Sequence, residues 1–221
     1  MSKVVIARIV VLGMMLFSII ACKQVDDQPK EDIYPWQITI QPDGKLRVFG
    51  IILNETTLID AAALLGRDYK IGLFETSNQP MSLEAYFNEV TMGGISGKFV
   101  MTLDATQDEL AELLQNAVKR KVLESGAKRY TLKAETSAVL AQKRITSLSY
   151  IPYINLDEEI INKRFGEPAE RIIVDQKRQH LLYPELGLDL LLDEEGKELL
   201  QYVAPAKFEQ LRQPLFEKYG R

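Results

Sequence analysis

The amino-acid sequence predicts an α+β fold in which helices pack on antiparallel sheets. Short apolar segments separated by turn residues are typical of antiparallel strands. Between them lie amphipathic segments that begin at capping residues and end at glycine, a pattern typical of helices. The order of strand, short capped helix, glycine stop, antiparallel strands and closing helix occurs twice along the 221 residues. From this repetition we expect two tandem units of one fold.

The first 21 residues have the pattern of a secretory signal peptide. Lys3 and Arg8 give a positive start, and Ile9–Ile20 is an uncharged apolar run. A membrane-spanning helix needs about 20 apolar residues, so this run is too short to span. We therefore expect residues 1–21 to be removed before Cys22, the single cysteine of the chain.

Cys22 is the predicted site of lipidation. The ending Ile19-Ile20-Ala21-Cys22 resembles a bacterial lipobox, after which the cysteine carries the lipid anchor. An ordinary signal peptide with an accidental thiol is the alternative, but exported cysteines are usually paired, and lipidation explains an unpaired one. Residues 22–33 are expected to form the lipidated cysteine and a flexible tether, since Lys23–Asp32 is polar and charged. Ten such residues reach at most about 35 Å.

The first α+β unit is expected over residues 34–126. It opens with a predicted hairpin, in which Gln37–Ile40 leads into a turn at Gln41-Pro42-Asp43-Gly44 and a single strand follows over Leu46–Leu53. A short helix then begins at the capping residue Thr57 and ends at Gly66, and a longer helix runs from Thr106 to a stop at Gly126. The remaining strands of this unit are expected at Tyr69–Phe74, Ser82–Phe87 and Lys98–Leu103.

The second unit is expected over residues 127–221. A short helix is predicted between an Asn155 cap and Gly166, and a closing helix after Pro205. We expect Gly66 and Gly166 both to have positive φ, because glycine enters that conformation without penalty at helix ends. The strands of this unit are predicted at Arg129–Lys133, Ile145–Ile151, Arg171–Val174, His180–Tyr183, Leu188–Leu192 and Leu199–Val203.

The second half resembles the BamE/SmpA type of small outer-membrane lipoprotein. The resemblance is carried by a helix ending in Phe165-Gly166-Glu167-Pro168, by the strands after it and by Leu199–Val203. It implies two helices packed on a three-stranded antiparallel sheet, a shape shared with the β-lactamase inhibitor protein (BLIP), and thus two tandem BamE/BLIP-like units. Proteins of that type support outer-membrane protein assembly, but their partner-binding residues have no match here, so this role is not carried over residue by residue. From Tyr34 onward the chain is similar to uncharacterised proteobacterial lipoproteins.

Composition and motifs give no sign of a catalytic or metal site. The chain has 27 basic and 31 acidic side chains, a net charge of −4, and no basic cluster that would indicate nucleic-acid binding. Gly93–Lys98 lacks the spacing of a phosphate-binding loop, and Asp189–Gly196 lacks that of a calcium loop. His180 is the only histidine and is expected on a sheet, without the partners of a zinc site or a catalytic triad. We expect no cofactor.

Two aromatic segments are the candidate partner-binding residues. Tyr34 and Trp36 follow the tether, and Tyr150 and Tyr153 lie where a strand meets a helix. Tyrosine and tryptophan are enriched at the centres of protein interfaces. The alternative is that these side chains pack over the edge of the core.

The functional prediction is a lipid-anchored protein on the periplasmic face of the outer membrane. Lys23 follows the cysteine where an aspartate would commonly mark inner-membrane retention, so the inner membrane is the less favoured location. The chain is expected to be a non-enzymatic interaction or scaffold protein of the cell envelope, whose partner is an envelope or outer-membrane protein. One alternative is a carrier of a lipid or cell-wall fragment. The other is an enzyme with an unrecognised carboxylate site.

Overall fold

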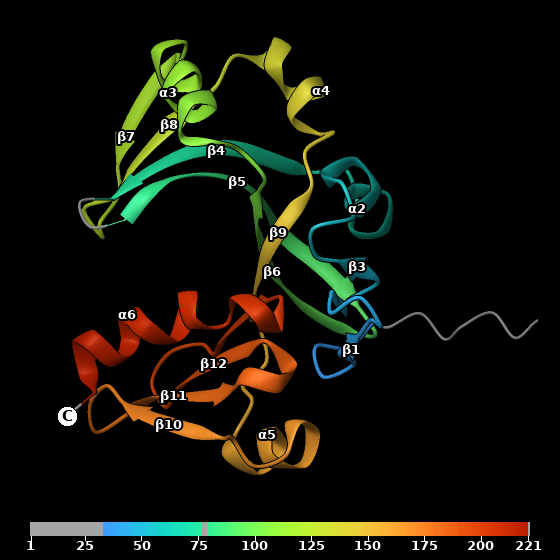
Figure 1. The fold of residues 1–221 in the computed structure, drawn as a ribbon, viewed down its shortest axis with the longest axis vertical. Coiled ribbons are helices and arrows are strands. Elements are labelled where there is room, and N and C mark those ends of the chain that lie inside the picture. The colour runs from blue at the N-terminus through green and yellow to red at the C-terminus, as the bar shows by residue number, and fades with distance from the viewer. Residues whose placement is uncertain (1–32, 77–78, 221) are drawn as a thin grey trace, which may run out of the picture. The chain divides into compact units, whose positions relative to one another are not determined.

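The protein has the predicted α+β class, with two antiparallel sheets and helices packed on them (Figure 1). The structure is a computed structural model that describes residues 33–76 and 79–220, so the predicted signal peptide and Cys22 lie outside it. The strands are β1 (Thr39–Ile40), β2 (Leu46–Val48), β3 (Ile51–Ile52), β4 (Tyr69–Thr76), β5 (Gln79–Met92), β6 (Ile95–Leu103), β7 (Lys119–Val122), β8 (Lys128–Thr131), β9 (Ile145–Pro152), β10 (Glu170–Ile173), β11 (Arg178–Tyr183), β12 (Leu188–Asp193) and β13 (Leu199–Val203). The helices are α2 (Leu58–Leu65), α3 (Gln107–Gln115), α4 (Ser137–Leu140), α5 (Glu158–Phe165) and α6 (Glu209–Tyr219), with short 3₁₀ turns η1 (Ala134–Thr136), η2 (Pro184–Leu186) and η3 (Pro205–Lys207).

One sheet of ten strands runs through both halves of the chain. Its order is β10-β11-β12-β13-β9-β6-β5-β4-β8-β7, and every neighbouring pair is antiparallel. Strand β9 joins the halves because it pairs with β6 on one side and with β13 on the other. The small sheet β1-β2-β3 is separate from it.

The predicted helix starts and glycine stops are largely confirmed. Thr57 caps α2, and Thr106 forms a capping box with Glu109 at the start of α3. Gly66 and Gly166 follow α2 and α5 with φ of 101° and 81°, as expected. The cap of α5 differs from the prediction, because the side chain of Asp157 rather than Asn155 accepts the backbone N–H of Ile160.

The predicted single strand over Leu46–Leu53 is instead the hairpin β2–β3. Phe49 and Gly50 form its two-residue turn with φ of 54° and 75°. Positive φ at both central residues is typical of a type I′ turn, whose twist matches the right-handed twist of the two strands that it joins. Phenylalanine is an unusual residue at such a position, so the sequence pattern does not indicate the turn.

The helix that begins at Thr106 ends earlier than predicted. Helix α3 stops at Gln115, and Lys119–Val122 forms β7, which pairs with β8. Gly126 lies in the turn of this hairpin, with φ of 82°. The predicted division between residues 126 and 127 therefore falls inside a hairpin, and Asp32–Arg221 is one compact unit.

The expected repetition of one fold is not found. Strand β9 precedes α5 and pairs with β13, the last strand of the meander that follows. Strand β3 precedes α2 in the same way, yet it pairs only with β2 in the small sheet. The two halves therefore share an order of elements but pair their strands differently, and two tandem BamE/BLIP-like units are not what the structure shows.

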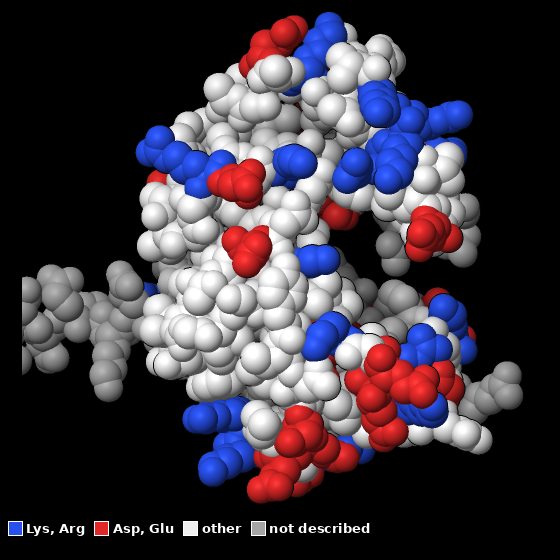
Figure 2. All heavy atoms as spheres, turned by 180° about the vertical axis from the view of Figure 1, so that it is seen from behind, with Lys and Arg blue, Asp and Glu red and all other residues white. Residues whose placement is uncertain are grey.

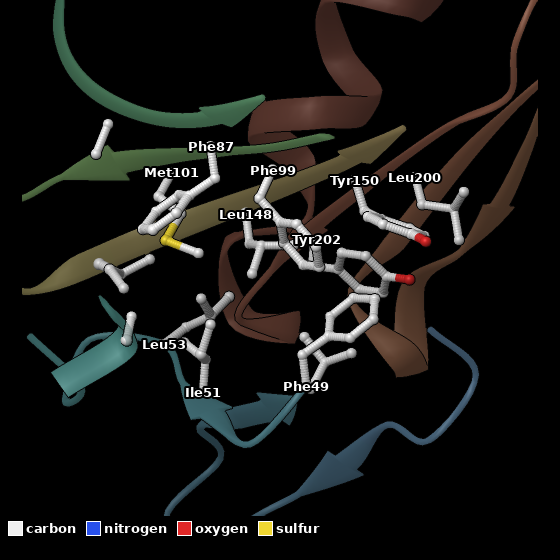
Figure 3. Close-up of a cluster of buried hydrophobic side chains, with 14 of the residues drawn as sticks. Phe49, Ile51, Leu53, Phe87, Phe99, Met101, Leu148, Tyr150, Leu200 and Tyr202 are labelled. Atoms are coloured by element: carbon white, nitrogen blue, oxygen red, sulfur yellow. The ribbon is translucent and has the colours of Figure 1, made fainter. Parts of the chain in front are cut away.

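An aromatic cluster lies at the centre of the main core (Figure 3). Phe49 is 1% exposed, and its ring centroid lies 4.9 Å from that of Phe99, 5.0 Å from Tyr150 and 6.3 Å from Tyr202. The β2–β3 turn thus places its phenylalanine against the side chains of β6, β9 and β13. Apolar residues of α2, α3, α4 and α5 join the same core, namely Leu58, Leu110, Leu140 and Ile161.

The large sheet has two unlike faces. We call the face that carries the aromatic core the inner face and the opposite one the outer face. Over β10–β13 the outer face is covered by α6, because Leu182 and Val203 form a second small core with Phe208 and with Leu211 of the helix. Helix α6 continues through Pro214 to Tyr219. Across the described residues, no helix is long and apolar enough to cross a membrane.

Candidate functional site

The segment that contains Tyr34 and Trp36 is fixed to the body of the protein. The two rings stack with centroids 5.1 Å apart, and the Arg164 guanidinium lies 4.4 Å from the centre of the Trp36 ring. The hydroxyl of buried Tyr202 donates to the Pro35 carbonyl oxygen at 2.9 Å. Both candidate rings are half-buried, which leaves part of each at the surface.

Tyr153 lies at the same turn of the sheet as Tyr34. Its backbone N–H donates to Ser96 at 2.9 Å, and its hydroxyl donates to the Asn88 carbonyl. The ring of Tyr34 rests against Gly93, where a Cβ atom would lie 2.5 Å from the ring. Three of the four candidate aromatic residues therefore gather around the β5–β6 turn.

Tyr150 is not available to a partner, which corrects the prediction for this residue. It is 1% exposed, and its ring centroid lies 4.7 Å from that of Phe99. Burial raises the pKa of its phenol to about 12. Alternation along β9 turns this side chain inward, so Tyr150 belongs to the aromatic core.

The outer face over β4, β5, β6 and β9 is the surface that sequence reasoning missed. Cross-strand pairing places Glu84, Thr102 and Ser147 in one row, and Tyr86, Val100 and Ser149 in the next. All six side chains are half-buried, and the buried side chains of α2, α4 and α5 belong to the core of the opposite face. Figure 2 shows a deep hollow between the part of the molecule with the β7–β8 hairpin and the part with α6.

A cavity of about 300 Å³ lies where this face meets α6. Hydroxyl groups of Ser82, Thr102 and Ser147 contribute to its lining from the sheet side. The Ser147 hydroxyl donates to that of Thr102 at 2.8 Å. Lys207, Gln210 and Leu211 line the opposite wall, from η3 and α6. The lining of the cavity therefore combines hydroxyl, amide, cationic and apolar groups with the carboxyl of Asp104.

Glu84 is the ionisable group of this face whose environment is most unusual. Burial raises the pKa of its carboxyl, and a 2.6 Å hydrogen bond donated by the Ser82 hydroxyl partly opposes that shift. No described residue forms an ion pair with it. A desolvated carboxyl without a cationic partner costs stability.

His180 lies on the sheet as expected, but it is buried rather than at the surface. Its Nδ1 atom is 2.8 Å from Asp189 Oδ1, and both side chains are almost fully buried. Burial raises the pKa of the Asp189 carboxyl, while hydrogen bonding to His180 opposes the shift. Four strand spacings, about 19 Å, separate Asp189 on β12 from Glu84 on β5. These two carboxyls cannot act together on one bond.

The two loops considered for ligand binding are hairpin turns. Gly93 and Gly94 join β5 to β6 with φ of 56° and 80°, and Asp193–Gly196 follows the end of β12. Within the described part of the chain, no group of three or more His, Cys, Asp or Glu side chains could hold a metal ion.

The alternation of residue types along the strands was the available signal for the outer face. Ser82, Glu84 and Tyr86 alternate with Leu83, Ala85 and Phe87 along β5. Such a pattern predicts a half-buried strand. It does not tell whether a helix covers the polar side, since that depends on distant segments.

Comparison with known proteins yields no relative from which a role could be carried over. No protein-family model, curated protein or solved structure matches the chain.

Proposed function

We propose that this chain is a lipid-anchored interaction protein of the cell envelope that holds a protein partner on its outer face. The observation that carries the proposal is the uncovered outer face of β4, β5, β6 and β9, together with the hollow beside it. Its half-buried hydroxyl, aromatic and aliphatic groups resemble the mixed composition of non-obligate interfaces.

The carboxyl of Glu84 supports the same proposal. A folded protein gains nothing from a desolvated carboxyl without a cationic partner, since a glutamine there would keep the hydrogen bond at lower cost. A partner that donates hydrogen bonds or positive charge to this carboxyl would recover that cost. Binding sites commonly retain such locally unfavourable groups.

Anchoring through Cys22 belongs to the proposal as a sequence prediction. Residue 33, where the described chain begins, lies eleven residues after the cysteine, so the body is held within about 40 Å of the lipid. An acyl anchor with two or more chains would retain the protein stably at the periplasmic face of the outer membrane. The half-buried rings of Tyr34 and Trp36 lie directly after this tether.

No specific observation favours the carrier or the enzyme as a second candidate. The cavity of the outer face is lined by hydroxyl and cationic groups besides apolar ones, which does not suit an acyl chain. The two carboxyls with raised pKa are four strands apart, so they do not form an acid–base pair.

Two substitutions on neighbouring strands test the proposal. Val100 and Ser149 are opposed on β6 and β9, and Val100→Arg or Ser149→Arg places a long cation on the outer face without entering the core. Leu64→Arg is the matched control, because Leu64 lies on α2 at the other face and is 49% exposed.

The assay is reversible crosslinking in intact cells, followed by detection of discrete adducts of the protein. The amount of the main adduct should fall at least tenfold in each of the two outer-face variants and remain unchanged in Leu64→Arg. All three variants are compared at equal protein level and equal melting temperature. Equal adducts from all three variants would contradict the proposal, as would loss only with Leu64→Arg.

A further inference from the structure

Strand β4 has an open edge along its first three residues. From Gly72 to Phe74 it pairs with β5 on one side and β8 on the other, and Glu75 pairs with β8. From Tyr69 to Ile71 it pairs with β5 alone. Strand β8 ends at Thr131, after which the chain leaves the sheet toward η1, and none of the described strands takes its place. Backbone groups on this edge are available for pairing with another strand.

A cavity of about 730 Å³ lies over this open edge. It is bounded by Ile59 and Ala62 of α2, by β4 itself, by the end of β8 and by Ser137 of α4. Three residues of an added strand need about 10 Å of edge. The cavity therefore leaves room for the side chains of a peptide segment that pairs with this edge.

The side chains around this edge are cationic and aromatic. Arg67, Lys70 and Arg129 line the cavity, and none of the described residues that line it is an aspartate or a glutamate. None of these three cations forms an ion pair with a residue that the structure describes. Arg129 donates instead to the Tyr86 hydroxyl at 3.1 Å. Charge complementarity thus selects an acidic occupant.

We propose that an extended acidic peptide segment of a partner protein adds to the large sheet at Tyr69–Ile71, with its carboxylates against Arg67, Lys70 and Arg129. Main-chain hydrogen bonds to the open edge supply affinity in this mode of recognition, and alternate side chains supply specificity. Every second side chain of the segment points to the same face, so an alternating acidic and β-branched sequence fits the edge.

The probe is a fluorescent hexapeptide of alternating glutamate and valine, titrated onto the mature chain by fluorescence anisotropy. Its matched control has the same sequence and charge but is N-methylated at every residue, which removes the N–H donors from both edges of the strand. A second control peptide replaces every glutamate by lysine.

Lys70→Glu should weaken binding of the acidic peptide at least tenfold, because Lys70 is exposed and lines the cavity. Lys163→Glu, an exposed position on α5 outside the cavity, should leave binding unchanged. The N-methylated and the lysine peptides should each bind at least tenfold more weakly than the probe. Bound probe should also slow amide exchange in Tyr69–Ile71.

Equal binding of the N-methylated peptide would overturn strand addition and leave a plain anion site. Binding unaffected by Lys70→Glu, or no binding of the acidic peptide at all, would overturn the proposal as well. The outer-face partner is distinguished by Ser149→Arg, which lies three strand spacings from Lys70 and should reduce the crosslinked adduct without altering the affinity for the acidic peptide.

Discussion

Replacing Phe49 tests whether a hairpin turn builds the centre of the core. The ring is 1% exposed and packs against Phe99, Tyr150 and Tyr202, so Phe49→Ala should cost about 3–5 kcal/mol of unfolding free energy. Phe216 is the matched control, because it is 49% exposed on α6. Phe216→Ala should cost less than about 1 kcal/mol.

The backbone of Phe49 adds a second, sharper expectation. Its φ of 54° lies in the left-handed region, which costs a residue with a Cβ atom about 1–2 kcal/mol. Alanine keeps this cost, whereas glycine removes it. Phe49→Gly should therefore be more stable than Phe49→Ala by about 1 kcal/mol, although glycine is usually the less stable of the two within a regular element.

The assay is urea unfolding of the mature chain that carries Cys22→Ser, followed by fluorescence and circular dichroism together. A cost below about 1 kcal/mol for Phe49→Ala would show that the ring does not fill the core. A Phe49→Gly variant less stable than Phe49→Ala would show that the turn lacks positive φ. Either result would refute the description of the β2–β3 hairpin.

Three further predictions follow from single groups. Burial raises the pKa of the Glu84 carboxyl in the folded state. Ionised Glu84 therefore lowers the free energy of unfolding above this raised pKa, and has no effect below the pKa of the carboxyl in the unfolded chain. Glu84→Gln should stabilise the protein at pH 7, and in urea titrations this gain should disappear by about pH 3. Tyr202→Phe leaves the buried Pro35 carbonyl oxygen without its donor, so it should cost about 1–3 kcal/mol and speed proteolysis near residue 33. Cys22→Ser should abolish lipidation and release the protein from membranes on sedimentation, and a processed, lipid-bearing variant would contradict the predicted anchor.

Local sequence signals predicted the class of the fold and the starts of its helices. The capping box at Thr106 and the glycines at positions 66 and 166 are properties of a few neighbouring residues, and all three lie where the pattern placed them. The hairpin at Phe49-Gly50 was missed because the common signal for such turns is asparagine or aspartate before glycine.

Long-range pairing explains the other differences between prediction and structure. Lys119–Val122 continues a helical stripe in sequence, but it forms an edge strand because β8 offers a partner that neighbouring residues do not reveal. Lysine on an exposed edge strand also discourages pairing with other chains. The two halves looked like repeats because their order of elements matches, whereas the choice of partners for β3 and β9 depends on distant segments.

The candidate site was only partly accessible to sequence reasoning. Aromatic residue types pointed to Tyr34, Trp36 and Tyr153, which the structure brings to the β5–β6 turn, and also to Tyr150, which fills the core. The outer face could not be found, because its residues come from separate strands and only the finished sheet leaves them uncovered.

The outer face is tested most directly by site-specific photocrosslinking in intact cells. A photoreactive residue is placed in turn at Lys98, Val100 and Thr102, which alternate along β6 toward the outer face, and at Leu64 and Ile160 on helices of the other face. The proposed function predicts one protein adduct of the same size from the three β6 positions and none of that size from the helices. Adducts from the helix positions alone, or from no position on β6, would contradict an outer-face partner.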